Sequence, residues 1–143
     1  AYLPDDPASH TFNGLTARNR VMFGPAGHLY VYLSYGIHRC ANVVTGAQES
    51  GQAVLLRAVR PEQGLDSMRM RRRRPDAELA NGPGKLCQAL GIELHHDGVD
   101  LLGDSIVSIL DDGTAPPDAP LTGPRIGISK AVDAPLRFRV PIS

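Results

Sequence analysis

The chain has 143 residues, 42% of them hydrophobic, which is enough for one domain with its own core. No apolar run approaches the roughly 20 residues of a membrane-spanning helix, which excludes such a helix within this sequence. Zero net charge alone argues against a nucleic-acid binder, but the charge is unevenly distributed. Residues 1–74 carry ten basic and five acidic side chains, and residues 75–143 carry five and ten. Such asymmetry suits a protein with one face toward nucleic acid.

The first third of the chain is predicted to form a loop followed by a β-hairpin. In chain order we expect a loop over 4–28 with one short helix near 17–23, then strands over 29–33 and 38–45. Successive side chains of a strand point to opposite faces. Tyr30 and Tyr32 should therefore share one face, whereas Val31 and Leu33 should point toward a core.

Further short strands and helices are predicted in the rest of the chain. We expect a strand over 52–59, helices over 61–73 and 84–90, strands over 105–110, 125–129 and 136–140, and a proline-rich loop over 113–124. Pro61 suits a first helical turn, Leu65, Met68 and Met70 are candidate packing residues, and Gly91 is the expected left-handed stop. The pattern predicts the α+β class, a single domain with a curved antiparallel sheet and flanking short helices.

Neither the cysteines nor the histidines indicate a metal site. Cys40 and Cys87 have no CxxC spacing and no neighbouring histidine cluster, so a zinc site is not predicted. A disulfide stays open as an alternative, but two buried thiols in a reducing compartment are favoured. Four histidines also lack metal-ligand spacing: His28, His38, His95 and His96.

Short blocks of residues follow one another in a recognisable order along the whole chain. They are Ala1–Leu3, His10, Thr16–Arg20, Met22-Phe23, the hairpin with Asn42–Val44, Val54–Ala58, Pro61–Gly64, Met68-Arg69, Gly82–Leu90, Arg125–Ile128 and Pro135–Phe138. In order and spacing, this set resembles the alkyladenine (3-methyladenine) DNA glycosylase family of base-excision repair enzymes. The resemblance covers residues 1 to about 140.

The resemblance implies an activity, a partner and a location. Enzymes of this family flip a damaged purine, such as 3-methyladenine or hypoxanthine, out of double-stranded DNA and hydrolyse its N-glycosidic bond with water. They are monofunctional, need no cofactor and leave an abasic site. By resemblance the chain is a monomer that binds damaged duplex DNA rather than a membrane, and that works inside the cell, in the cytoplasm at the nucleoid or in a nucleus.

One feature of the family is missing from this sequence. The family's general base is a glutamate directly before the Ala-Tyr pair, and the sequence begins at Ala1. Either residues 1–143 are a glycosylase domain truncated at the N-terminus, or this form is catalytically inactive, and we expect the former. The end of the chain, over residues 138–143, also has the pattern of a strand that is cut inside or just after it.

The resemblance assigns four residues to the flipped base. Tyr32 would stack on one face of the base, and Tyr2 and His10 would close the opposite face. Asn42 would lie beside the 2-position of the purine and exclude the 2-amino group of guanine. Taken alone, the tyrosines are more often core residues, His10 a capping or surface residue, and Asn42 an edge-strand residue that satisfies backbone groups.

Three residues are assigned to the DNA gap and to the water. Tyr35 stands at the hairpin tip, where Gly36 tolerates the positive φ of a tight turn, and by resemblance it intercalates to fill the gap left by the flipped nucleotide. Arg57 ends an apolar strand, so its head should be partly enclosed and need an acidic or phosphate partner. By resemblance it positions the water; the alternative is a structural ion pair.

Four further residues are candidate contacts to DNA phosphates: Thr16, Arg18, Arg20 and Lys85. Gly82-Pro-Gly-Lys85 lacks the Ser or Thr that ends a phosphate-binding P-loop, but a lysine at a helix start can still hold one phosphate. Asn19 is at least as well explained by a hydrogen bond that braces its loop. The arginine run over residues 69–74 is best explained as a solvated helix end.

Two other functions are compatible with the same residues. The first is a binding module that recognises lesions or distorted minor grooves without cutting. The second is a small sheet domain that contacts RNA or a partner protein through the hairpin. A glutamate before Ala1 favours the enzyme over the binding module.

Overall fold

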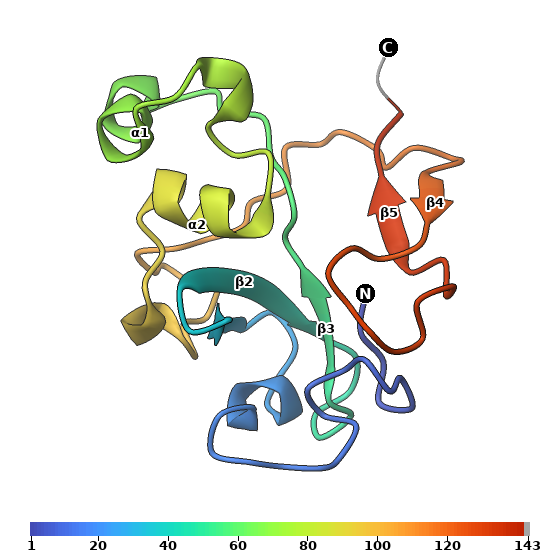
Figure 1. Ribbon diagram of the computed structural model, residues 1–143. Helices are drawn as coiled ribbons and strands as arrows, with labels where there is room; N and C mark the ends of the chain where they lie inside the picture. The colour runs from blue at the N-terminus through green and yellow to red at the C-terminus, as the bar shows by residue number, and fades with distance from the viewer. Residues whose placement is uncertain (142–143) are drawn as a thin grey trace.

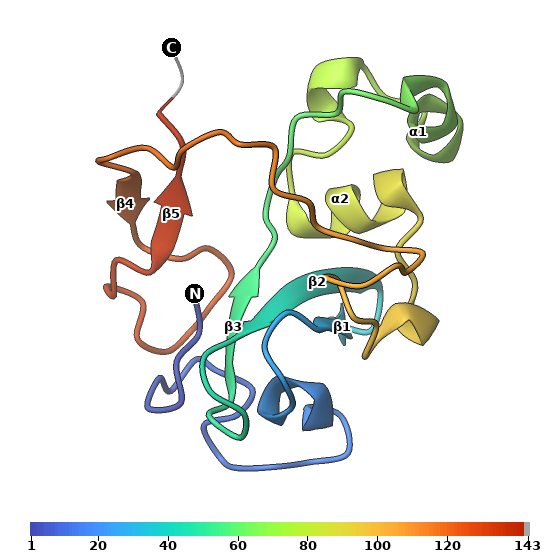
Figure 2. The same cartoon turned by 180° about the vertical axis from the view of Figure 1, so that it is seen from behind.

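An antiparallel sheet of three strands lies at the centre of the fold, as the computed structural model of residues 1–141 shows (Figures 1 and 2). Its strands are β1 (Leu29–Ser34), β2 (His38–Thr45) and β3 (Gln52–Leu55), in that order. The helices are α1 (Leu65–Arg72) and α2 (Pro83–Leu90), with 3₁₀ turns η1 (Arg20–Phe23), η2 (Asp76–Glu78) and η3 (Leu94–His96). A second, two-stranded antiparallel sheet pairs β4 (Leu121–Gly123) with β5 (Arg137–Arg139). The α+β class and the antiparallel strands are confirmed.

The hairpin β1–β2 forms as the sequence predicts. Its register runs from Leu29 opposite Val43 to Ser34 opposite His38. Tyr35 and Gly36 make the turn with φ values of 52° and 67°, a conformation that glycine adopts at no steric cost. The N-terminal segment adds to the other edge of the sheet, where Tyr2 and Ala53 exchange backbone hydrogen bonds of 2.9 and 3.1 Å.

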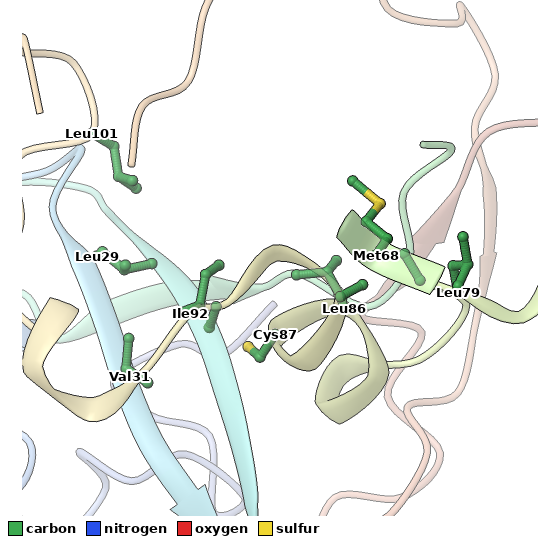
Figure 3. Packing of buried hydrophobic residues seen from close by; sticks show 11 residues of the cluster. Leu29, Val31, Met68, Leu79, Leu86, Cys87, Ile92 and Leu101 are labelled. Carbon is green, nitrogen blue, oxygen red and sulfur yellow. The ribbon is translucent and has the colours of Figure 1, made fainter. Parts of the chain in front are cut away.

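The sheet separates two apolar clusters, because its side chains alternate between the faces. One face packs against α2 and the segments around it, and its cluster includes Leu29, Val31, Leu86 and Leu101 (Figure 3). The other face packs against η1 and buries Met22, Tyr30, Val44 and Ala53. Tyr30 and Tyr32 therefore share a face, as predicted. Val31 points into the core, as predicted. Leu33 was also predicted to point toward the core, but it lies near the hairpin tip and is half-exposed.

The two helices begin and end at residues with recognisable backbone geometry. Helix α2 begins at Pro83, and Gly91 ends it at φ 72°, which confirms the predicted stop. Helix α1 begins at Leu65, because Gly64 before it is left-handed at φ 72°, so the prediction of a start at Pro61 is wrong. Met68 is buried, whereas Met70 is 80% exposed and does not pack in the core as predicted.

Several predicted strands are shorter or absent. The strand predicted over 52–59 ends at Leu55, and that over 136–140 is the three-residue β5. Residues 105–110 and 125–129 are bends rather than strands, and the loop predicted over 113–124 contains β4. In the first of these segments Ile106 and Leu110 are more than 80% exposed, so these side chains do not pack on a sheet. The predicted cut at the chain end concerns Ile142 and Ser143, which lie outside the described residues.

Cys40 and Cys87 are free and buried, which confirms the two predicted thiols. Burial raises the pKa of Cys87 to about 11 and also raises that of Cys40. Within residues 1–141, no helix is both long enough and apolar enough to cross a membrane.

Candidate functional site

A cavity of about 770 Å³ opens between the hairpin, the N-terminal segment, the start of α2 and the loop of residues 126–130. Eight of the predicted site residues line it: Tyr2, His10, Arg18, Tyr32, Tyr35, Asn42, Arg57 and Lys85. The other three do not: Thr16, Arg20 and Gly36. The fold therefore brings residues from positions 2 to 85 around one space.

Stacked aromatic rings form one wall of this cavity. The rings of Tyr30 and Tyr32 stack with centroids 5.5 Å apart, and the guanidinium of Arg18 lies 5.5 Å from the Tyr32 centroid. The His10 ring meets Tyr32 edge-on at 4.4 Å, so the two lie side by side rather than across the cavity. A base between two rings needs about 7 Å, twice the contact distance between carbon atoms. The space between His10 and Tyr32 is therefore too narrow for one.

The tyrosine hydroxyls and the His10 imidazole of this wall are uncharged at neutral pH. Burial raises the pKa of Tyr30 to about 12 and raises that of Tyr32 still further. Part of His10 faces solvent, but desolvation of the rest and the nearby charge of Arg18 lower its pKa. Nδ1 of the neutral imidazole lies 3.1 Å from the Tyr30 hydroxyl. The rings are thus uncharged, and this hydrogen bond joins His10 to Tyr30.

Asn42 lies on the central strand β2, directly opposite Tyr30 on β1. Its side chain is 3% exposed, and its Nδ2 donates to the backbone carbonyl of Tyr30 at 3.2 Å. The predicted satisfaction of a backbone group is therefore confirmed, whereas the predicted edge-strand position is wrong, because β2 lies between β1 and β3. Because Asn42 also lines the cavity, this hydrogen bond fixes the position of a polar group at the cavity wall.

The cationic residues of the site differ in their surroundings. Arg57 follows β3, is half-buried and borders both this cavity and a second one of about 1330 Å³ beside β4–β5. Within residues 1–141 it takes part in no ion pair, so the structural ion pair considered for it is not formed there. Arg18 donates to the Leu33 carbonyl at 3.0 Å, and Lys85 donates to Asn81 at 3.2 Å.

The loop before η1 is braced by Asn19. This residue is 2% exposed, and its Nδ2 donates to the carbonyls of His10 and Gly14 at 2.9 and 3.0 Å. Its Oδ1 accepts the backbone N–H of Thr16 at 2.7 Å. The bracing role expected for Asn19 is confirmed, and it places His10 at the cavity.

Tyr35 is the most exposed aromatic residue of the site. It stands at the hairpin tip with 85% of its surface exposed, although it also borders the cavity. A large ring held in water by a tight turn contributes little to the core. The position leaves the ring available for contact with another molecule.

Three features of the site were not predicted from the sequence. Arg72 of the arginine run lines the cavity and donates to Gln88 at 3.1 Å, whereas Arg69 pairs with Asp66 and Asp76 on the surface. The loop of residues 126–130, predicted as a strand, forms another part of the cavity wall. Arg125, just before this loop, is buried in an ion pair with Asp6. No local sequence pattern reports contacts between such distant residues.

Comparisons with known proteins show which family the sequence resembles. The whole chain, residues 1–143, matches the family model described as methylpurine-DNA glycosylase (MPG). A protein of Agrobacterium fabrum is 56% identical over 139 residues, which cover 96% of this chain and 69% of the relative. Relatives from Burkholderia lata and Methanoculleus marisnigri are 52% and 51% identical, over 95% and 96% of the chain and 67% and 73% of their own lengths. All three bear the name "Putative 3-methyladenine DNA glycosylase".

Proposed function

The chain belongs to the methylpurine-DNA glycosylase family, and we propose that it excises 3-methyladenine and hypoxanthine from double-stranded DNA by hydrolysis of the N-glycosidic bond. Residues 1–143 would be the glycosylase domain, acting as a monomer without a cofactor. The observation that carries the proposal is the joint placement of Tyr2, His10, Tyr32 and Asn42 around one cavity, with the exposed Tyr35 at its mouth. The relatives above come from bacteria and an archaeon, which gives no support to the nuclear location considered from the sequence.

The geometry suggests how a flipped base would be held. The base enters between Tyr2 on one side and the joined rings of Tyr32 and His10 on the other, because His10 and Tyr32 leave no room between them. Each aromatic face contributes about 1–3 kcal/mol of stacking. Asn42, fixed by its bond to Tyr30, excludes the 2-amino group of guanine by clash. Tyr35 fills the gap in the duplex and prevents the base from returning.

Hydrolysis needs an activated water beside C1′ of the flipped nucleotide. Water attacks C1′ as the bond to the base breaks, and the electron pair of that bond leaves with the base. Arg57, half-buried and free of ion pairs within residues 1–141, is the group we assign to hold the water and a nearby phosphate. The general base, which takes the proton of the water, is the glutamate that the family resemblance predicts directly before Ala1.

Arg18 and Lys85 are assigned to DNA phosphates, because both border the cavity and neither forms an ion pair within residues 1–141. Thr16 and Arg20 are exposed and stand outside the cavity, so contacts from them would lie farther along the duplex. We assign Gly36 the role of forming the turn that presents Tyr35 to the DNA.

A matched pair of polypeptides tests the proposal. Residues 1–143 are produced with a single preceding Glu or a single preceding Gln, and single-turnover excision is measured on duplexes that contain 3-methyladenine, hypoxanthine or no lesion. General base catalysis contributes about 10²–10⁴-fold, so the Glu form should exceed the Gln form by that factor on both lesions. A Glu form that binds lesion duplexes but releases no base would instead identify a lesion-binding module. Equal excision by the two forms would refute the assigned base.

A further inference from the structure

A buried arginine joins three segments behind the wall of the cavity. The Arg125 and Asp6 side chains are only 3% and 4% exposed, and the two guanidinium Nη atoms bond the two carboxylate oxygens of Asp6. Nη1 also donates to the carbonyl of Ala1 at 3.1 Å, and Nη2 to that of Ala131 at 3.3 Å. One side chain therefore ties the N-terminal residue, the turn at Asp6 and the end of the loop over 126–131.

The same guanidinium lies against Tyr2. Its central carbon is 4.9 Å from the centroid of the Tyr2 ring, within range of a cation–π interaction. Tyr2 borders both cavities, whereas Arg125 borders only the second one, beside β4–β5. Arg125 therefore supports the ring without bordering the space proposed for the base.

The backbone on either side of Tyr2 is also fixed. Tyr2 pairs with Ala53 of β3, and the backbone nitrogen of Ala1 lies 2.6 Å from the Leu136 carbonyl. These bonds hold the main chain but leave the ring free to rotate about its side-chain bonds. Within residues 1–141, Arg125 is the only cation placed over this ring, which makes it the candidate group to orient the ring.

We propose that Arg125 is a positioning residue for base recognition: it holds the Tyr2 ring and the loop of residues 126–130 at the separation that admits a purine. The inference rests on the function proposed above. It depends on the planar fork of arginine, which can bond two carboxylate oxygens and lie flat on a ring at once. Lysine carries the same charge but cannot do both, so Arg125→Lys separates geometry from charge.

Equilibrium binding tests the proposal with two duplexes, one with hypoxanthine and one with a tetrahydrofuran abasic analogue, which offers no base to Tyr2. Because a misplaced ring loses part of its stacking, Arg125→Lys should raise the Kd for the hypoxanthine duplex about five- to tenfold. The Kd for the abasic duplex should change less than twofold. Arg60→Lys is the matched control, since Arg60 is 88% exposed and pairs only loosely with Glu62, and it should change neither Kd.

A double-mutant cycle distinguishes positioning from general stability. In a Tyr2→Leu background, Arg125→Lys should cause no further loss of hypoxanthine affinity, because the ring that it positions is absent. Additive losses, or equal losses on both duplexes, would overturn the proposal. If Arg125→Lys does not fold, as judged by circular dichroism, Asp6→Glu replaces it, because the longer carboxylate displaces the guanidinium without removing its charge.

A readout without DNA separates this inference from the proposed function. Ring resonances of ¹³C-labelled tyrosines should shift for Tyr2 in Arg125→Lys, while those of Tyr35 at the hairpin tip should stay in place. Unchanged Tyr2 resonances would refute the positioning role. If the unmutated protein does not prefer hypoxanthine duplex over plain duplex, the proposed function fails, and the resonances still decide whether Arg125 orients Tyr2.

Discussion

Asp6→Asn should destabilise the fold far more than an ordinary surface substitution. Asparagine can accept only one hydrogen bond from the Arg125 fork, and its amide N–H₂ faces the other guanidinium nitrogen. The Arg125 charge would then stay buried at 3% exposure without a counter-charge. Removal of one partner of a buried ion pair costs about 3–5 kcal/mol, a large part of the roughly 5–15 kcal/mol that stabilises a domain. For about 150 residues this lowers Tm by roughly 10–15 °C.

Thermal unfolding followed by circular dichroism measures this effect, and Asp66→Asn is the matched control. Asp66 also pairs with an arginine, but its side chain is 96% exposed, so its loss should change stability by less than about 1 kcal/mol. A Tm of Asp6→Asn within 2 °C of that of Asp66→Asn would refute the reasoning. It would mean that the Asp6–Arg125 pair stabilises the fold no more than a surface pair does.

The difference in the free energy of unfolding between the wild type and Asp6→Asn should also depend on pH. Burial alone would raise the pKa of Asp6, but hydrogen bonds from Arg125 and from the backbone N–H of Ala8 outweigh it, so the pKa lies below its ordinary value of 3.8. The ionised carboxylate therefore contributes its full stability above pH 3.8. That contribution is lost as pH falls below 3.8 through the lower pKa of the folded state. Unfolding curves between pH 7 and pH 2 should converge at the acid end.

Three further predictions concern DNA. Tyr35→Ala should leave Tm unchanged, because the ring is 85% exposed, but should weaken binding to abasic duplex more than to undamaged duplex; equal losses would reduce Tyr35 to a general contact. Asn42→Ser should admit guanine while hypoxanthine binding persists, and continued exclusion of guanine would place the selection elsewhere in the cavity. Neutralising Arg18 and Lys85 together should reduce the log–log salt slope of duplex binding by about 1.8, whereas Arg74→Ala, outside the cavity, should not. A binding constant of the unmutated protein that does not vary with salt would refute DNA binding.

The hairpin could be predicted because its information is local. Alternating side chains and a turn that needs positive φ lie within 17 consecutive residues, and the structure has both, with φ 52° at Tyr35 and 67° at Gly36. The same holds for α2, where Pro83 and Gly91 mark the two ends. Short-range steric preferences decide these elements wherever they lie in the fold.

Predictions failed where the outcome depends on a distant partner. Residues 105–110 are rich in β-branched and apolar side chains, but a strand needs a neighbour with free backbone groups, and Ile106 and Leu110 face water instead. The segment over 125–129 is apolar enough for a strand, yet it bends at Gly127, whose φ is 77°, and its Arg125 bonds to Asp6, 119 residues away. Sequence spacing carries no record of such a contact.

In the candidate site too, the residues could be predicted but the contacts between them could not. Its residues were predicted through the family resemblance, and the structure gathers eight of them around one cavity. Their mutual arrangement was not predictable, since the edge contact of His10 with Tyr32 depends on the bracing of a loop by Asn19. The ends of local elements can thus be read from single residues, whereas the shape of a cavity depends on contacts between several segments.

The span between Asp6 and Arg125 has a consequence during protein synthesis. The hairpin closes over 14 residues from Leu29 to Val43, whereas the ion pair closes over 119, an added loop entropy of about 2 kcal/mol. A ribosome adds about 5–20 residues per second, so a nascent chain that has just gained the hairpin waits roughly 4–16 seconds for Arg125. Throughout that interval the Tyr2 ring lacks the guanidinium that lies beside it in the folded chain. The part of the cavity wall around Tyr2 is therefore completed only after most of the chain has been made.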